Sequence, residues 1–268
     1  KSRKHDREIA EFIVAERGKN LIECLDEVEW IDSIFEYYSE IGRDQKGRVV
    51  APVASRSMSM VVKEAYGVVG CIVPWNYPLL LMAWKVAPAL AAGNTLVIKP
   101  SEYTPLSIMR WLEVACDHLP QGTVNMITGD GVTGSYLVEH SETRVVAFTG
   151  SVDTGKKIAI MAARQLKKTS LELGGNDPII ICDDVDINIA ARGTTWGGFL
   201  NAGQVCTSLE REYVIEIKTD DFIEADVEQA KKVSKDLFNF SPKFSINESP
   251  IIPSDKINLS NPPESKAA

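Results

Sequence analysis

The sequence predicts an α/β fold built on a Rossmann-like parallel sheet flanked by helices. From residue 66 onward, short apolar runs alternate with segments of helical periodicity, which favours parallel strands joined by right-handed crossovers. The apolar runs are nearly continuous, as in sheets covered on both faces. In sheets of this kind, ligands bind beyond the carboxyl ends of the strands.

The composition argues against several classes of partner. The 268 residues suffice for one large or two small domains. With 29 basic and 37 acidic residues the net charge is −8, and no basic stripe is present, so nucleic acid and anionic membranes are poor candidates as partners. The longest apolar run, residues 77–92, is interrupted by Pro78, Lys85 and Pro88 and is too short to cross a bilayer.

The amino terminus and the cysteines predict a compartment. No apolar segment of the kind found in signal peptides follows the first residues. The five cysteines are an odd number without paired spacing, and the three histidines do not cluster with them. We therefore expect reduced thiols in a cytoplasmic protein, with neither a disulfide framework nor a metal site.

The amino-terminal part is predicted to be helical. Across residues 5–40 apolar side chains recur at helical spacing, and Gly18 is expected to separate two helices. Residues 47–64 then change to two short apolar stretches, which predict a β-hairpin. Such a hairpin can add to the sheet of another subunit or pack on its own domain, and the sequence favours neither.

From there strands and helices alternate. Strands are expected at 67–73, 95–99, 124–127, 144–148, 169–173, 179–182 and 212–217. Helices are expected at 79–91, from Pro105 to about 118, at 133–140, from the residues after Gly155 to about 166, at about 186–199 and at 220–237. Thr104 is expected to cap its helix, with Pro105 at the first helical position. Residues 238–268 carry many Pro, Ser and Asn and predict an irregular or disordered tail.

Polar clusters follow the ends of several predicted strands. They are Trp75-Asn76, Lys99 to Glu102, Gly150-Ser151 and Glu172. Because parallel strands end at one edge of a sheet, we expect these clusters to form one site. The Asn76 amide could donate to an oxyanion, although a lone asparagine more often bonds its own backbone in a turn.

Two of these clusters suggest a nucleotide. Gly150 and Ser151 at the start of a helix could hold a pyrophosphate, whereas a plain strand–turn–helix is the simpler interpretation. The spacing from Gly150 to Lys156 also approaches a P-loop, but Lys157 replaces the hydroxyl residue that binds magnesium, which argues against a nucleoside triphosphatase. Lys99 and Glu102 could bind ribose hydroxyls or form a simple salt pair. A carboxylate there would favour NAD over NADP.

A cysteine and a glutamate suggest acyl chemistry. Cys206 lies in a small, polar, glycine-bearing segment, and Glu172 stands beside Gly174 and Gly175. A thiol nucleophile with a carboxylate base suits such chemistry. Taken alone, these two residues are better explained as a buried cysteine and a surface glutamate.

Together the clusters resemble the NAD(P)-dependent aldehyde dehydrogenase superfamily. Five segments stand in the family's order and at its spacing over about residues 5–237: Pro74-Trp75-Asn76-Tyr77-Pro78, Lys99-Pro100-Ser101-Glu102, Phe148-Thr149-Gly150-Ser151, Glu172-Leu173-Gly174-Gly175 and Gly203-Gln204-Val205-Cys206. Any one is weak evidence, but five in order are specific.

The resemblance implies roles in NAD-dependent oxidation of an aldehyde to a carboxylic acid. Cys206 would be the nucleophile, Asn76 and the Cys206 N–H would hold the oxyanion, and Glu172 would activate water for thioester hydrolysis. The residues implied to bind the cofactor are Trp75, Lys99, Glu102, Gly150, Ser151 and Leu173.

The resemblance also implies a domain plan and a truncation. It implies an NAD-binding domain over residues 1–174, with an oligomerisation hairpin at about 47–64 that suggests a homo-oligomer, and the start of a catalytic domain over residues 175–237. Family members are longer, so the chain is expected to represent the central part only. The alternative function is therefore an inactive chain that binds cofactor or a partner subunit without turnover.

Overall fold

The computed structural model describes residues 2–51 and 56–239. The chain divides into two compact units, an amino-terminal unit up to Leu173 and a carboxy-terminal unit from Gly174. The division falls one residue from the expected boundary at 174. That the two units serve as cofactor-binding and catalytic domains stays a prediction.

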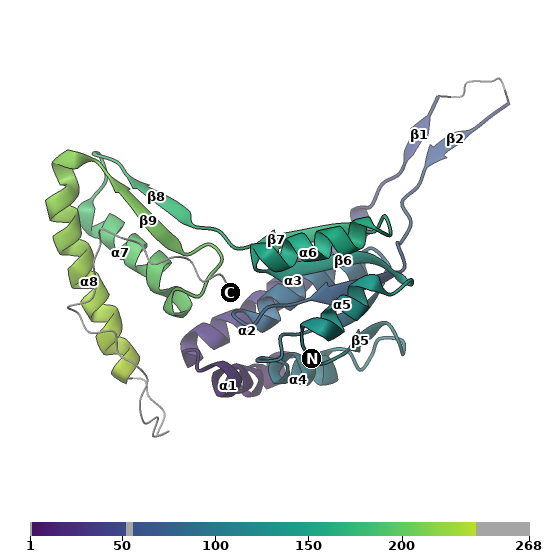
Figure 1. Cartoon of the computed structure of the whole chain (residues 1–268), viewed down its shortest axis with the longest axis horizontal. Helices are drawn as coiled ribbons and strands as arrows, with labels where there is room; N and C mark the ends of the chain where they lie inside the picture. The colour runs from purple at the N-terminus through teal and green to yellow at the C-terminus, as the bar shows by residue number, and fades with distance from the viewer. Residues whose placement is uncertain (1, 52–55, 240–268) are drawn as a thin grey trace. The chain divides into compact units, whose positions relative to one another are not determined.

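The amino-terminal unit is built on a five-stranded parallel sheet (Figure 1). Its strands are β3 (Val68–Ile72), β4 (Thr95–Lys99), β5 (Val124–Met126), β6 (Thr143–Gly150) and β7 (Lys168–Leu173). The spatial order β5-β4-β3-β6-β7 is the order of a Rossmann sheet, because the chain starts centrally, runs to one edge and then to the other. This confirms the predicted fold class and places the reversal point between β3 and β6.

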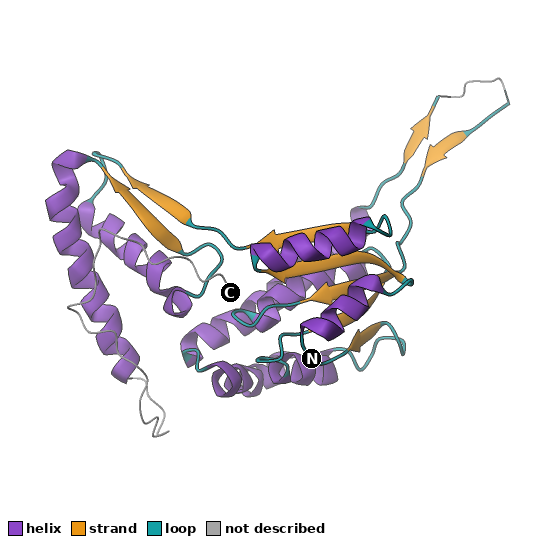
Figure 2. Cartoon of the chain, in the orientation of Figure 1, coloured by secondary structure: helices purple, strands orange, loops and turns teal. Residues whose placement is uncertain are grey.

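Helices cover both faces of this sheet (Figure 2). One face packs against α1 (Asp6–Arg17), α2 (Leu21–Ile41), α3 (Pro78–Ala91) and α4 (Leu106–Ala115). The other face packs against α5 (Gly131–Glu139) and α6 (Val152–Ala163). Successive side chains of β3 point to opposite cores, Cys71 to the first and Ile72 to the second. The near-continuous apolar strands follow from this two-sided burial.

The break between the first two helices lies where the sequence predicts it. A short 3-10 turn, η1 (Ser2–His5), leads into α1, which ends at Gly18 with a left-handed φ of 73°. Glycine adopts this conformation without steric cost. The side chain of Asn20 then caps α2 by accepting a hydrogen bond of 3.0 Å from the N–H of Ile22.

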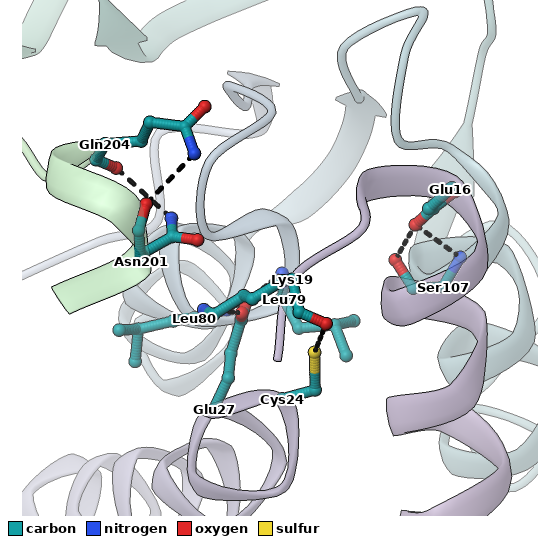
Figure 3. A network of polar contacts seen from close by, with 9 residues as sticks. All are labelled: Glu16, Lys19, Cys24, Glu27, Leu79, Leu80, Ser107, Asn201 and Gln204. Carbon is teal, nitrogen blue, oxygen red and sulfur yellow. Dashed lines mark hydrogen bonds and ion pairs between the residues drawn. The ribbon is translucent and has the colours of Figure 1, made fainter. Parts of the chain in front are cut away.

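The expected cap of α4 is wrong. The helix begins at Leu106, and the buried Thr104 hydroxyl makes no hydrogen bond to any described residue. Instead the carboxylate of Glu16, at the end of α1, accepts hydrogen bonds from the N–H groups of Leu106 (2.8 Å) and Ser107 (3.2 Å) and from the Ser107 hydroxyl. Figure 3 shows the two contacts with Ser107. A carboxylate from elsewhere in the chain therefore replaces the local cap.

The predicted hairpin is present. After η2 (Gly42–Asp44), β1 (Arg48–Val50) pairs antiparallel with β2 (Ser59–Val61), and Val49 lies opposite Met60. All six strand residues are exposed, Val49 by 74%. Residues 52–55, which include part of the predicted connection, lie outside the described residues. The side chains of these strands are therefore not packed in the core of the unit.

The carboxy-terminal unit has a two-stranded parallel sheet, β8 (Asp177–Ile181) and β9 (Leu209–Val214). Its other elements are α7 (Ile187–Phe199), η3 (Leu200–Gly203), η4 (Glu216–Lys218) and α8 (Thr219–Asn239). Ile181 packs with Ala191 of α7 and Phe222 of α8. Of the predicted tail, residues 240–268 lie outside the described residues.

Two features are absent from residues 2–51 and 56–239. No helix in these ranges is long and apolar enough to span a bilayer. The same ranges contain no cluster of three or more side chains suited to bind a metal ion.

Candidate active site

The strand ends of the amino-terminal unit align at one edge. Ile72 is in register with both Lys99 and Phe148, and Gly150 is in register with Leu173. The segments that follow β3, β4 and β6 therefore leave the sheet at the same edge, where Glu172 of β7 also lies. The polar clusters of these strands therefore lie at one edge, and that they form one site stays a prediction. Cys206 belongs to the carboxy-terminal unit.

The loop after β3, residues 74–77, carries Asn76 and is called here the Asn76 loop. The guanidinium carbon of Arg17 lies 3.6 Å from the centroid of the Trp75 ring. The ammonium of Lys19 lies 3.4 Å from the centroid of the Tyr77 ring. Both neighbours of the half-buried Asn76 are thus in cation–π contact, one with the end of α1 and the other with the link between α1 and α2.

A buried ion pair (Figure 3) lies next to Tyr77 of this loop. The Lys19 ammonium donates to the Glu27 carboxylate at 2.8 Å, and both side chains are fully shielded from solvent. The same carboxylate accepts from the N–H groups of Leu79 (2.9 Å) and Leu80 (3.1 Å) in the first turn of α3. Burial raises the pKa of the Glu27 carboxyl, while the Lys19 ammonium and the two N–H donors oppose the shift.

The remaining nucleotide candidates lie around β4, β6 and β7. Lys99 is buried and lies 3.5 Å from the carboxylate of Glu102, which is exposed by 48%. The Ser151 hydroxyl caps α6 by accepting from the N–H of Thr154 at 3.3 Å. A Cβ on Gly155 would stand 2.4 Å from the Leu173 side chain, so α6 can approach β7 only because this position is glycine.

Glu172 faces an aromatic hollow of about 460 Å3. Its other lining residues are Trp30, Ser33, Ile34, Tyr37, Tyr38 and Trp84. Trp30 is exposed by 60% and Trp84 by 46%, so large apolar rings are open to solvent beside a carboxylate. The arrangement offers an apolar contact surface next to a potential base.

A buried lysine of α3 was not anticipated from the sequence. Lys85 donates a hydrogen bond to the Thr149 hydroxyl near the end of β6, and Thr149 is in register with Glu172. The signal was available, because Lys85 is the one charged residue in a helix whose other residues are almost all apolar. The burial of Glu27 could be predicted in a similar way, since it shares a helix face with the apolar Cys24 and Ile31.

Cys206 follows a tight turn in the carboxy-terminal unit and is half-buried. Asn201, Ala202 and Gly203 have φ values of 50°, 56° and 74°, which is uncommon for two successive non-glycine residues. The side-chain amides of Asn201 and Gln204 each donate to the other's backbone carbonyl, at 3.2 and 3.0 Å (Figure 3). These reciprocal bonds hold a strained backbone immediately before the thiol.

The sequence of the chain is similar to those of known proteins. The model of the Aldehyde dehydrogenase family matches residues 2–241. Betaine aldehyde dehydrogenase 1 of Oryza sativa subsp. japonica is 43% identical over 221 residues, which cover 81% of this chain and 44% of that protein. Succinate-semialdehyde dehydrogenase, mitochondrial, of Arabidopsis thaliana is 41% identical over 231 residues, which cover 85% of this chain and 44% of that one.

Solved structures of aldehyde dehydrogenases are also similar to this chain. Betaine aldehyde dehydrogenase from Staphylococcus aureus in complex with NAD+ superposes with a TM-score of 0.83 at 39% identity, over 86% of this chain and 46% of that one. NAD-dependent aldehyde dehydrogenase from Sinorhizobium meliloti gives a TM-score of 0.83 at 35% identity, over 85% and 46% of the two chains. The chain therefore spans less than half the length of these relatives, and it belongs to the aldehyde dehydrogenase family.

Proposed function

We propose that the chain serves the NAD-dependent oxidation of an aldehyde to a carboxylic acid. The observation that carries this proposal is the alignment of the strand ends, which brings Asn76, Lys99, Ser151 and Glu172 to one edge beside the reversal point of a Rossmann-ordered sheet. Nucleotides bind at such points in doubly wound sheets. Membership of the aldehyde dehydrogenase family supports the reaction type.

The residues at this edge fit a dinucleotide. Gly155 permits the close approach of α6 to β7, and Ser151 caps the helix that starts at the sheet edge. The N-terminus of a helix attracts phosphate. Lys99 and Glu102 would bind the adenosine ribose. Gly150 and Ser151 would bind the pyrophosphate. Trp75 and Leu173 would line the cofactor site. NAD, when bound, would supply the hydride acceptor.

The chain's own groups would carry the acyl chemistry. Cys206 would attack the aldehyde carbonyl as thiolate and later hold the acyl group as a thioester. The Asn76 amide and the Cys206 N–H would donate to the oxygen that becomes negative. Glu172 would take a proton from the water that hydrolyses the thioester, which releases the acid and the thiol.

The aromatic hollow beside Glu172 supports a class of substrate. Its lining contains two tryptophans, two tyrosines and one carboxylate, and it contains neither lysine nor arginine among the described residues. Aromatic faces and a carboxylate attract cations and repel carboxylates. We therefore propose aldehydes that carry an amino or trimethylammonium group as preferred substrates.

The oxidation is tested by NADH absorbance with purified chain, NAD and short aldehydes. We expect a signal that Cys206→Ala abolishes and that Cys182→Ala, a second accessible thiol, leaves unchanged. Asn76→Ala should lower kcat by about 10²–10³. NAD binding without NADH formation by the wild-type chain would overturn the proposal and favour the cofactor-binding chain without turnover. This alternative is supported by the coverage of less than half of each relative.

Substrate class is tested by comparing betaine aldehyde with succinate semialdehyde. We expect the cationic aldehyde to have the higher kcat/KM, and Trp84→Leu to reduce that advantage by about fivefold or more, since a cation–π contact in a desolvated site contributes roughly 1–2 kcal/mol. Equal kcat/KM for the two aldehydes, or a preference for the carboxylate, would contradict the substrate assignment and leave the oxidation itself untouched.

We also propose that the hairpin mediates self-association. Val49, Met58 and Met60 are each more than half exposed, which leaves an apolar edge with unpaired backbone groups. Sedimentation of the wild-type chain should therefore show an oligomer, and Val49→Asp/Met60→Lys should shift it toward monomer. A wild-type monomer at every concentration would contradict this proposal.

A further inference from the structure

The Asn76 loop receives its support from outside the sheet. Residues on either side of Asn76 contact cations, Trp75 contacting Arg17 and Tyr77 contacting Lys19. Both cations come from the end of α1 and the link to α2, more than fifty positions earlier in the chain. A cation over a ring restricts both the position and the tilt of that ring. The backbone between the two rings is thereby restricted as well.

The other end of the loop is held by Glu27. Helix α3 has Tyr77 at its N-cap position, and this side chain provides no cap. The Glu27 carboxylate supplies the missing acceptor to Leu79 and Leu80, while its second oxygen binds Lys19. The Cys24 thiol in turn donates to the Lys19 carbonyl at 3.7 Å. One network therefore joins the start of α2, the ring of Tyr77 and the first turn of α3.

We propose that the buried Lys19–Glu27 pair is a positioning device for the Asn76 loop, a role that has catalytic meaning only if the proposed oxidation holds. The pair contacts residues that follow Asn76, namely Tyr77, Leu79 and Leu80. It fixes the start of α3 and the Tyr77 ring, and through them the angle at which the Asn76 amide leaves the sheet edge. Oxyanion donors are effective only when they are held in place before the reaction.

The location of the pair argues for this role over simple stabilisation. A buried ion pair is seldom more stabilising than well-packed apolar residues of similar size, because both charges lose their hydration. The fully shielded lysine and glutamate therefore matter mainly through the groups that they contact. Those groups are the Tyr77 ring and two N–H groups in the first turn of α3.

The chain offers a matched control in Glu16. Its carboxylate likewise accepts from the first N–H groups of a distant helix, those of Leu106 and Ser107 in α4. Glu16→Gln and Glu27→Gln therefore make the same chemical change at two helix starts. Only the second of these helices follows the Asn76 loop.

The test is amide hydrogen exchange, read by mass spectrometry on peptides covering residues 74–81 and 104–110. In Glu27→Gln we expect exchange in 74–81 to accelerate by at least about tenfold, since hydrogen bonds to a charged group are lost or weakened. The 104–110 peptide should be unchanged. Glu16→Gln should show the converse. Unchanged exchange in 74–81 for a folded Glu27→Gln chain overturns the proposal.

A second variant separates positioning from folding. Lys19→Met/Glu27→Leu replaces the pair by apolar side chains of similar size, so no unpaired charge is left in the interior and the chain should stay folded. The cap and the cation–π contact are both lost, and exchange in 74–81 should again accelerate by at least about tenfold. If this folded variant exchanges like the wild type, the packing around the loop holds it and the proposal fails.

Kinetics distinguish this proposal from the proposed oxidation. With an active wild type, Glu27→Gln should lower kcat by about tenfold or more and leave the KM for NAD unchanged, whereas Glu16→Gln should leave both unchanged. A loosened loop with unaltered kcat would overturn the catalytic part of the proposal. A loosened loop in a chain whose wild type forms no NADH would sink the oxidation while supporting the positioning of the loop.

Discussion

The parallel sheets of the two units differ in how they are covered. Helices pack on both faces of the five-stranded sheet, so that β3 and β4 are buried on each side. In the two-stranded sheet, Ile179 and Ile181 face α7 and α8, whereas Ile180 is exposed by 70% and its register partner Tyr213 by 53%. The same kind of apolar run thus serves two-sided burial in one unit and one-sided burial in the other.

The difference teaches that an apolar strand does not by itself report how many faces are covered. Parallel sheets are normally shielded on both sides. Within the described residues the carboxy-terminal unit provides helices for one side only, and its exposed residues include Trp196 and Phe199 of α7 as well. We therefore expect the amino-terminal unit to be the more rigid and the better protected of the two.

Thiol reactivity should separate the units most sharply. Cys24 and Cys71 lie buried in the amino-terminal unit, and burial raises the pKa of each thiol to about 12. Cys182 of the carboxy-terminal unit is exposed. Because the thiolate is the reactive form, we expect Cys182 to react with iodoacetamide at least about 10³-fold faster than Cys24 or Cys71 at pH 8. Similar rates in peptide mass spectra would break the comparison.

Two isoleucine truncations test burial directly. Ile98 of β4 is fully buried, so Ile98→Ala should lower the free energy of unfolding by about 2–5 kcal/mol. Ile180→Ala removes the same atoms from an exposed site and should cost about 0.5 kcal/mol or less. Urea unfolding followed by tryptophan fluorescence measures both. A large loss for Ile180→Ala would show that its face is covered in solution.

Two helix glycines sharpen the comparison. In Gly155→Ala the new Cβ would meet Leu173 at 2.4 Å, and we expect a loss of roughly 1–3 kcal/mol from overpacking. In Gly193→Ala of α7 nothing lies within 4 Å of the Cβ, and better helix propensity should stabilise the chain by up to about 1 kcal/mol. If packing is tight around α6 and open around this part of α7, urea unfolding should show that the two variants change the free energy of unfolding in opposite directions.

The smallest expected effect is a pH dependence in the carboxy-terminal unit. Burial raises the pKa of Asp226, while the hydrogen bond from the Thr195 hydroxyl at 2.9 Å opposes the shift. Burial, with the nearby charge of Asp226, also raises the pKa of Glu212. These two carboxyls therefore hold their protons to a higher pH in the folded chain than in the unfolded chain, and their contribution to stability should fall as pH rises above about 4.

The matched variant for this effect is Asp226→Asn, which keeps an oxygen to accept from Thr195. It should be more stable than the wild type at pH 7, and the difference should shrink toward pH 4. Urea midpoints measured between pH 4 and pH 8 give the answer. A difference that stays constant or grows toward pH 4 would contradict the assignment.

Much of the amino-terminal unit follows from local patterns. Alternating strands and helices predict a parallel sheet, and the edge that gathers Asn76, Lys99 and Ser151 follows from where the strands end. The prediction of a Thr104 cap was wrong because the start of α4 is capped by Glu16, a distant carboxylate that local sequence spacing does not reveal. The Lys19–Glu27 network was hidden for the same reason, since Glu27 reaches its partner Leu79 across 52 positions.

The carboxy-terminal unit was harder to predict in detail. Its strand β9 begins at Leu209, three residues before the expected start, because the polar residues Glu210 and Arg211 mask the apolar pattern. The left-handed turn at Asn201 and Ala202 is an unusual conformation for these residue types, which propensity cannot anticipate. The roles of Cys206 and Glu172 stay predictions that the kinetic experiments address.

The two carboxylate caps have a consequence for how the domain can be divided. Glu16 and Glu27 lie before the first strand of the large sheet, yet they complete the starts of α4 and α3. A fragment that began at β3 would contain every strand of the nucleotide-type sheet and still lack both acceptors. We expect such a fragment to collapse without a fixed start to either helix, because the first two helices and the sheet share one hydrophobic core.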